Sequence, residues 1–305
     1  MKELPSFTWE QAFGPCFFEV QAPYLTSLLI YLKKDETLIP CTVFMALPTL
    51  VELCIDNGTE RMLDATALQS VTAALRHGAL QRLQKVELTG YDLGAGETGD
   101  FMDALEESGC AKRLITLSLF KCGAGADGVQ ALADLLDGGA FPALQYLCLF
   151  QNPGITDAGV VALAEALLKP TQTFWTKLDL TNVGMGDGGM AMLTSLVCQG
   201  RLKKLKQSCL PENDGITDRS VIALAGAIDT SGLPMLERFI CKRLDKVIQG
   251  VSAIALAVIK KCPHIEKIGV KNYDSTRRAG MIWLMGKWMC DNMGRMRSEE
   301  GLRMK

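Results

Sequence analysis

A glycine-rich stretch in the first third of the chain has the spacing of a dinucleotide-binding loop. Gly94, Gly96 and Gly99 lie between a predicted strand and a predicted helix, where such loops bind pyrophosphate through backbone N–H groups. The next such stretch, residues 123–128, is equally rich in glycine but lacks this spacing. The strands around it also lack the long apolar runs of a doubly wound parallel sheet. We therefore interpret these glycines as turns of the chain and expect no bound cofactor.

Side chains that bind metals or act as nucleophiles are present but do not form a known pattern. The 11 cysteines include no Cys-x-x-Cys pair, and the two histidines, His77 and His264, lie far apart in the sequence. A zinc site is therefore not expected. The chain also has no Gly-x-x-x-x-Gly-Lys loop, no Gly-x-Ser-x-Gly elbow and no His-Glu-x-x-His pair. These absences predict no metal and no catalytic residue, and hence a protein that is not an enzyme.

The composition favours a folded protein of the cytoplasm or the nucleus. The 305 residues are 48% hydrophobic and 22% charged, which allows a large buried core. The sequence contains no run of about 18 or more apolar residues, so no membrane span is expected. The first 20 residues carry acids and prolines where a signal peptide needs an unbroken apolar stretch, so the cysteines are expected to be reduced thiols.

The elements that must position these side chains recur about every 30 residues. Each unit begins with a Leu-x-x-Leu-x-Leu frame, whose alternation is typical of a short strand with one buried face. Apolar residues at helical spacing follow each frame. The first positions of the frames are Leu50, Leu83, Leu114, Leu144, Trp175, Leu205, Leu236 and Ile265. A constant period of this length predicts a solenoid, in which each unit buries its apolar face against its neighbours.

A carboxylate precedes several of the predicted helices. Asp157, Asp187 and Asp218 stand just before helical apolar patterns. A carboxylate at this place accepts hydrogen bonds from unpaired backbone N–H groups and interacts favourably with the helix dipole. We therefore interpret these three residues as helix caps rather than catalytic acids.

One segment gives the repeat a family resemblance. Residues 144–167 combine a leucine strand with Asn152 at its end and a full helix, and Cys122 and Asn213 take the place of Asn152 in two other units. This pattern resembles the leucine-rich repeats of the ribonuclease-inhibitor-like (RNI-like) family. The resemblance implies an α/β horseshoe of about eight strand–helix repeats with a parallel concave sheet, and a protein-binding function. The flanking units depart from the pattern at the asparagine position, which holds Gly58, Tyr91, Val183, Leu244 and Tyr273.

The two ends of the chain are expected to cap the solenoid. We assign residues 1–48 to an N-terminal cap that could include a degenerate repeat, residues 49–273 to the solenoid, and residues 274–305 to a capping helix and a basic tail. The predicted helix spans residues 276–298 and places Met and Trp side chains at helical spacing among basic ones. It could cover the last repeat, or it could bind a calmodulin-like partner or an anionic membrane surface.

The residues that flank the second and third leucine positions should point out of the concave face. This predicts an aromatic group of Phe120, Tyr146 and Phe150 in the middle of the solenoid, a type of residue common at binding hot spots. It also predicts a basic patch near the C-terminal end, formed by Arg238, Lys242, Lys267 and Lys271. Alternatively, a loop or the N-terminal segment could cover the aromatic residues. Cys54, Cys148 and Cys209 share the outward middle column and are expected to be unpaired thiols.

The net charge of −2 is unevenly distributed along the sequence. Residues 1–140 carry 10 basic and 19 acidic side chains, whereas residues 141–305 carry 22 and 15. In a solenoid this gives a dipole along the molecule, which can steer a partner of opposite polarity. No nucleic-acid-binding motif accompanies the basic residues, so nucleic acid is not an expected partner.

These observations predict a non-catalytic scaffold, monomeric on its own, that binds a protein partner through its concave face. The alternative is a GTPase-activating or regulatory protein for a Ran-like small GTPase, because Ran-type activators share this repeat family. The acidic C-terminal run of those activators is missing here. An assay of GTP hydrolysis separates the two hypotheses, because a scaffold leaves the rate unchanged. A third hypothesis is a module resembling innate sensors, although this sequence has no nucleotide-binding domain.

Overall fold

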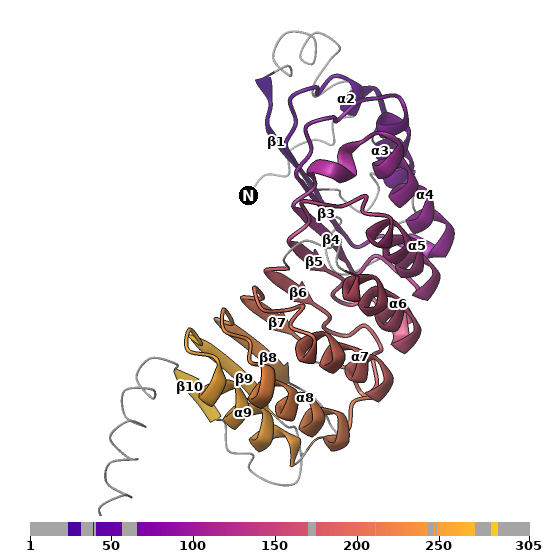
Figure 1. The fold of residues 1–305 in the computed structure, drawn as a ribbon. Helices are drawn as coiled ribbons and strands as arrows, with labels where there is room; N and C mark the ends of the chain where they lie inside the picture. The colour runs from indigo at the N-terminus through magenta and orange to yellow at the C-terminus, as the bar shows by residue number, and fades with distance from the viewer. Residues whose placement is uncertain are drawn as a thin grey trace, which may run out of the picture.

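The protein is an open, curved α/β solenoid. The computed structural model describes residues 24–31, 39, 41–56, 66–169, 175–210, 212–242, 247, 249–271 and 282–285. The strands line the inner, concave side of the arc and the helices line the outer side, and the chain advances from β1 at one end to β10 at the other (Figure 1). The predicted α/β solenoid is therefore confirmed.

One sheet runs through the described part of the chain, with its strands in sequence order. Its members are β1 (Ser27–Tyr31), β2 (Glu52–Asp56), β3 (Lys85–Thr89), β4 (Thr116–Phe120), β5 (Tyr146–Cys148), β6 (Lys177–Asp179), β7 (Gln207–Cys209), β8 (Arg238–Lys242), β9 (Lys267–Lys271) and β10 (Ile282–Met285). All neighbouring pairs from β1 to β9 are parallel, and β10 pairs antiparallel with β9. Strands β2 to β9 correspond to the eight predicted repeats, and β1 adds a further parallel strand before them.

A helix connects most strands to the next on the outer side of the sheet. The described helices are α2 (Cys41–Met45), α3 (Thr66–Arg76), α4 (Gly94–Glu107), α5 (Ala126–Asp137), α6 (Thr156–Leu168), α7 (Asp187–Cys198), α8 (Asp218–Ser231) and α9 (Gly250–Lys261), with short 3-10 turns η2 (Cys110–Arg113) and η3 (Pro153–Ile155). The core lies between the two layers. The second and third positions of the frame, such as Leu117 and Leu119, are almost fully buried there.

Two buried asparagines join neighbouring repeats. The Oδ1 atom of Asn152 accepts hydrogen bonds from the backbone N–H groups of Cys122 and Ala124, at 2.9 and 3.1 Å. Its Nδ2 atom donates to the carbonyl oxygens of Leu119 and Leu149, at 2.6 and 2.8 Å. Each amide thus satisfies backbone groups of the preceding repeat as well as its own, which matters because buried unpaired backbone groups are costly. Asn213 repeats the pattern two units later.

The predicted caps act on the following repeat. The Oδ1 atom of Asp157 accepts hydrogen bonds from the N–H groups of Gly186 and Gly189, at 2.6 and 2.8 Å, at the start of α7 rather than of its own helix α6. Asp218 likewise accepts a hydrogen bond from Gly250 N–H at 2.6 Å, at the start of α9. The carboxylates therefore cap helices, as predicted, but the helix that each one caps belongs to the next unit.

The C-terminal prediction was wrong over four residues. Ile282–Met285, which fall within the predicted helix of residues 276–298, form strand β10 on the edge of the sheet. An added strand satisfies the backbone groups that β9 would otherwise expose at that edge. The remaining residues of the predicted capping helix and basic tail lie outside the described residues, as do residues 1–23 of the predicted N-terminal cap. The three domain boundaries stay a prediction.

No helix among the described residues combines the length and the apolar character that crossing a membrane requires.

Candidate functional site: the concave face of the sheet

The outward residues of the concave face form three columns that cross the strands. The strand register places the first position of each strand beside the first position of the next, from Glu52 on β2 to Lys267 on β9. The middle column runs in the same way from Cys54 to Gly269. Because side chains alternate along a strand, these columns face away from the buried leucines.

Phe120, the last residue of β4, stacks on Phe150, which lies two residues after the end of β5. Their ring centroids are 4.7 Å apart and the rings are nearly parallel, at 9°. Both side chains are partly exposed. The backbone supports the contact, because the N–H group of Lys121 donates to the carbonyl oxygen of Phe150 at 2.8 Å. This geometry agrees with the prediction that the two phenylalanines are adjacent and point outward.

Tyr146 and Lys177 extend the aromatic group onto the next strand. The Nζ atom of Lys177 lies 4.3 Å from the centroid of the Tyr146 ring, in a cation–π contact. Burial raises the pKa of the Tyr146 hydroxyl above its usual range, with further contributions from Cys148 and Asp179, so this hydroxyl stays neutral. The group therefore presents apolar ring surface together with one ammonium.

The expectation that the middle-column cysteines face outward needs a correction for Cys148. Its strand position is the predicted one, but only 6% of the residue is exposed. Burial raises the pKa of the Cys148 thiol and raises that of Cys209 to about 12. Thiols with raised pKa values form little thiolate at neutral pH, so neither residue is suited to nucleophilic chemistry. The structure contains Cys54, Cys148 and Cys209 as free cysteines.

The basic patch is described in part. Arg238 and Lys267 pair across β8 and β9, with Arg238 exposed and Lys267 partly exposed. The backbones of Lys242 and Lys271 pair in the same two strands, but their side chains lie outside the described residues. The three aromatic rings and the basic patch are separate, because β6 and β7 lie between β5 and β8.

Charges of opposite sign are paired at the other end of the face. Lys85 Nζ lies 3.1 Å from Glu87 Oε2 within β3, and the Cys54 thiol donates to the same carboxylate oxygen at 3.2 Å. Burial, together with Glu87, raises the pKa of Cys54 to about 11. This end is therefore a satisfied polar network rather than a reactive site.

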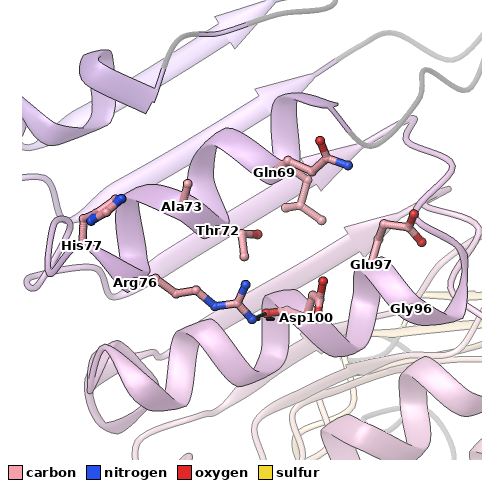
Figure 2. Close-up of a pocket in the computed structure, with 9 residues that line it drawn as sticks. Gln69, Thr72, Ala73, Arg76, His77, Gly96, Glu97 and Asp100 are labelled. Atoms are coloured by element: carbon pink, nitrogen blue, oxygen red, sulfur yellow. Dashed lines mark hydrogen bonds and ion pairs between the residues drawn. The ribbon is translucent and has the colours of Figure 1, made fainter.

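A groove on the outer side was not expected from the sequence. It lies between α3 and α4, has a volume of about 560 Å³, and is lined by Leu68, Gln69, Thr72, Ala73, Arg76, His77, Gly96, Glu97 and Asp100 (Figure 2). The Arg76 guanidinium closes one side through ion pairs with Asp100 and Glu107, at 3.8 and 3.4 Å. Gly96 has no side chain to fill the space. The glycine motif of residues 94–99 thus forms the start of α4 and one wall of the groove.

The described residues include no group of three histidine, cysteine or acidic side chains that could hold a metal ion. The expectation of a protein without a metal or cofactor stays a prediction, because part of the chain lies outside those residues.

The repeated strand, asparagine ladder and helix define the architecture of a leucine-rich repeat solenoid. No protein-family model and no curated protein sequence matches the chain. Among solved structures, it is similar to a chain of the Rad7 and Elc1 complex in yeast, with 14% identity, a TM-score of 0.36, and coverage of 86% of this chain and 82% of that one. It is also similar to the TLR13–ssRNA13 complex, with 17% identity and a TM-score of 0.45 over 82% of this chain. That match spans only 30% of the TLR13 chain.

Proposed function

We propose that this protein is a non-catalytic scaffold that binds a protein partner through the concave face of its solenoid. The observation that carries the proposal is the partly exposed stack of Phe120 and Phe150, extended by Tyr146 under Lys177. We further propose that the repeats are of the RNI-like type, because each strand from β2 to β8 is followed by a full helix. We also propose that the protein acts as a monomer in the cytoplasm or nucleus. Regulation of a Ran-like GTPase stays a prediction from family resemblance.

The aromatic group has the physical character of a binding hot spot. Large rigid rings bury much apolar area at a small cost in side-chain entropy, and hot spots are enriched in aromatic residues near the centre of an interface. The stack joins Phe120, the last residue of β4, to Phe150, two residues after the end of β5, near the middle of the ten-stranded sheet. Replacing one such anchor commonly costs about 2 kcal/mol of binding free energy or more. Loss of both rings should therefore abolish a complex of moderate affinity.

The test compares partner capture by the wild type and by the variant Phe120→Ser/Phe150→Ser. Each purified full chain is immobilised, exposed to lysate of the cells that make it, and analysed by quantitative mass spectrometry. The matched control is Ile222→Ser/Leu256→Ser, which removes two exposed apolar side chains from α8 and α9 on the outer side. Circular dichroism and thermal unfolding establish that all three proteins are folded.

We expect a set of proteins that the wild type and the control retain and that the Phe120→Ser/Phe150→Ser variant loses. Retention of the same proteins by the folded concave variant would refute the proposal. Loss only in the control would place the binding surface on the helices.

A further inference from the structure

The layer of helices is open between α3 and α4, where the groove of Figure 2 lies. Elsewhere in the layer, a glycine near the start of a helix packs against the helix before it. At Gly128 of α5, an added Cβ atom would lie 2.8 Å from the side chain of Thr98 on α4. At Gly250 of α9, it would lie 2.8 Å from the side chain of Val221 on α8. At Gly96 of α4, by contrast, an added Cβ atom would meet no atom within 4 Å, so this contact with the preceding helix is missing.

The groove has the length of a short stretch of extended chain. Its lining on α3 runs from Leu68 to His77, which corresponds to about 14 Å along the helix axis. About four extended residues cover the same distance. Leu68 and Thr72 are buried at the groove, whereas Gln69 and Glu97 are exposed beside it. The volume of about 560 Å³ lies within the range of pockets that bind ligands.

Helix α4 borders the groove with a series of carboxylates. It carries five acidic side chains and no basic one, namely Glu97, Asp100, Asp103, Glu106 and Glu107. Arg76 of α3 contacts Asp100 at 3.8 Å and Glu107 at 3.4 Å, but the Asp100 side chain stays 69% exposed. Among the described residues, no ion pair reaches Glu97. The groove therefore has two accessible carboxylates on its α4 side.

Helix stability does not explain this series. Like charges three or four positions apart on a helix are unfavourable, and Asp103 lies three positions from Asp100 and four from Glu107. Glu106 and Glu107 also lie in the last turn, where the helix dipole disfavours negative charge. The excess of acidic over basic side chains in residues 1–140 extends the negative potential over this end of the molecule. A cationic ligand bound in the groove would compensate these charges.

We propose that the groove between α3 and α4 binds a cationic protein segment, with about four extended residues along the groove and Lys or Arg side chains that contact Glu97 and Asp100. The open space beside Gly96 receives the backbone and the small or apolar side chains of this segment. A nucleic acid does not fit, because the carboxylates of α4 repel phosphate groups. The groove lies on the helical side of the solenoid and the aromatic group on its concave side, so this second binding surface does not depend on the proposed function.

The test selects peptides from a phage-displayed library of random dodecapeptides on the immobilised full chain. A synthetic copy of the most enriched peptide is then titrated with each variant, and its fluorescence polarisation gives the Kd. The variant Gly96→Leu fills the groove and keeps every carboxylate, and the open space there allows this change within the helix. The variant Glu97→Gln/Asp100→Asn keeps the shape of the groove and removes two charges.

Each variant has a matched control on the same layer of helices. Gly226→Leu makes the same substitution in α8, where an added Cβ atom also meets no atom within 4 Å. Asp127→Asn/Asp134→Asn makes the same change in charge at exposed positions of α5 that do not line the groove. Circular dichroism and thermal unfolding establish that all variants are folded.

We expect the wild type to enrich peptides that carry at least two Lys or Arg residues within about four positions. Gly96→Leu and Glu97→Gln/Asp100→Asn should each raise the Kd at least about tenfold, because one blocks the groove and the other removes the charged contacts. Both controls should leave the Kd unchanged. The variant Phe120→Ser/Phe150→Ser should also leave it unchanged, because it alters only the concave side.

Other results would overturn the inference. These are a lack of cationic peptides above background, or a Kd that Gly96→Leu does not change. A Kd raised equally by Asp127→Asn/Asp134→Asn would show attraction to the acidic end as a whole rather than a site in the groove. Spermine that binds the wild type more tightly than any selected peptide, and is lost in Glu97→Gln/Asp100→Asn, would assign the groove to a small cation. Peptides lost only in Phe120→Ser/Phe150→Ser would overturn this inference and support the proposed function, so the two proposals fail separately.

Discussion

Replacing Asn152 with cysteine tests the hydrogen-bonded ladder. Cysteine is the natural residue at the same place one repeat earlier, Cys122, so a sequence comparison of the repeats would suggest a harmless change. The structure predicts the opposite. Asn152 is fully buried and its amide satisfies two backbone N–H groups and two carbonyl oxygens. A thiol is a weak donor and a poor acceptor, so it replaces at most one of these bonds.

The magnitude follows from the groups that would lose their partner. The N–H groups of Cys122 and Ala124 would be left buried without an acceptor, at about 1–3 kcal/mol each. The two carbonyl oxygens lose less, because each has a second lone pair. We therefore expect Asn152→Cys to lower the free energy of unfolding by about 3–5 kcal/mol, which is a large part of the total stability of a typical domain.

The assay is urea unfolding followed by circular dichroism, combined with hydrogen exchange of the amides. The amides of Cys122 and Ala124 should lose more protection than those of the distant helix α9. The control is Cys122→Ala, which removes the weak thiol contacts to the carbonyl oxygens of Leu88 and Phe120, both at 3.4 Å, and should cost about 1 kcal/mol or less. A cost for Asn152→Cys as small as that of Cys122→Ala would refute this account of the ladder.

Three further predictions concern the turns, the caps and the thiols. Gly184 has φ +73°, and an added Cβ atom would overlap the Pro153 carbonyl oxygen in the preceding repeat. Gly184→Ala should therefore lower the free energy of unfolding by at least about 2 kcal/mol in chemical denaturation. The control Gly226→Ala, where the added Cβ atom meets open space, should not destabilise the fold. Burial raises the pKa of the Asp187 carboxyl, but the hydrogen bonds that it accepts from Ser220 and Thr217 outweigh this effect and hold the pKa below its usual range. The ionised carboxylate therefore stabilises the fold at neutral pH, and this stabilisation is lost as the pH falls through the lowered pKa. The difference in unfolding free energy between wild type and Asp187→Asn should shrink below about pH 4; a constant difference would contradict this assignment. Iodoacetamide at pH 8 should modify the exposed Cys198 well before Cys209, whose pKa is about 12, as peptide mass spectrometry can show; equal rates would contradict it.

The sequence was sufficient for the fold and for the outward columns because both depend on short periodicities. The frame that begins at Leu144 has period two over its last residues, and a strict repeat leaves one register for neighbouring strands. For this reason the repeat frame alone predicts the adjacency of Phe120 and Phe150, which the stacked rings show. Their role in binding stays a prediction.

Other features depend on contacts between repeats that no local pattern reveals. The position of Cys148 in the strand was predictable, but its near-complete burial arises from neighbouring side chains on adjacent strands. Asp157 was identified as a cap, yet its partners lie about 30 residues later, in α7. Strand β10 replaced the helix expected at residues 282–285, because pairing with the open edge of β9 outweighed a weak helical pattern.

The ladder also has a consequence for how such a chain can change in length. Asn152 and Asn213 are 61 residues apart, and Val183 holds the same place in the repeat between them. Each asparagine satisfies backbone groups of the repeat before its own, whereas the caps Asp157, Asp187 and Asp218 recur in every repeat of this region. Deleting one repeat within this region would bring together two units that both lack, or both carry, the asparagine. Insertions and deletions should therefore be tolerated in pairs of repeats, so that the inherited unit of this part of the protein is a double repeat.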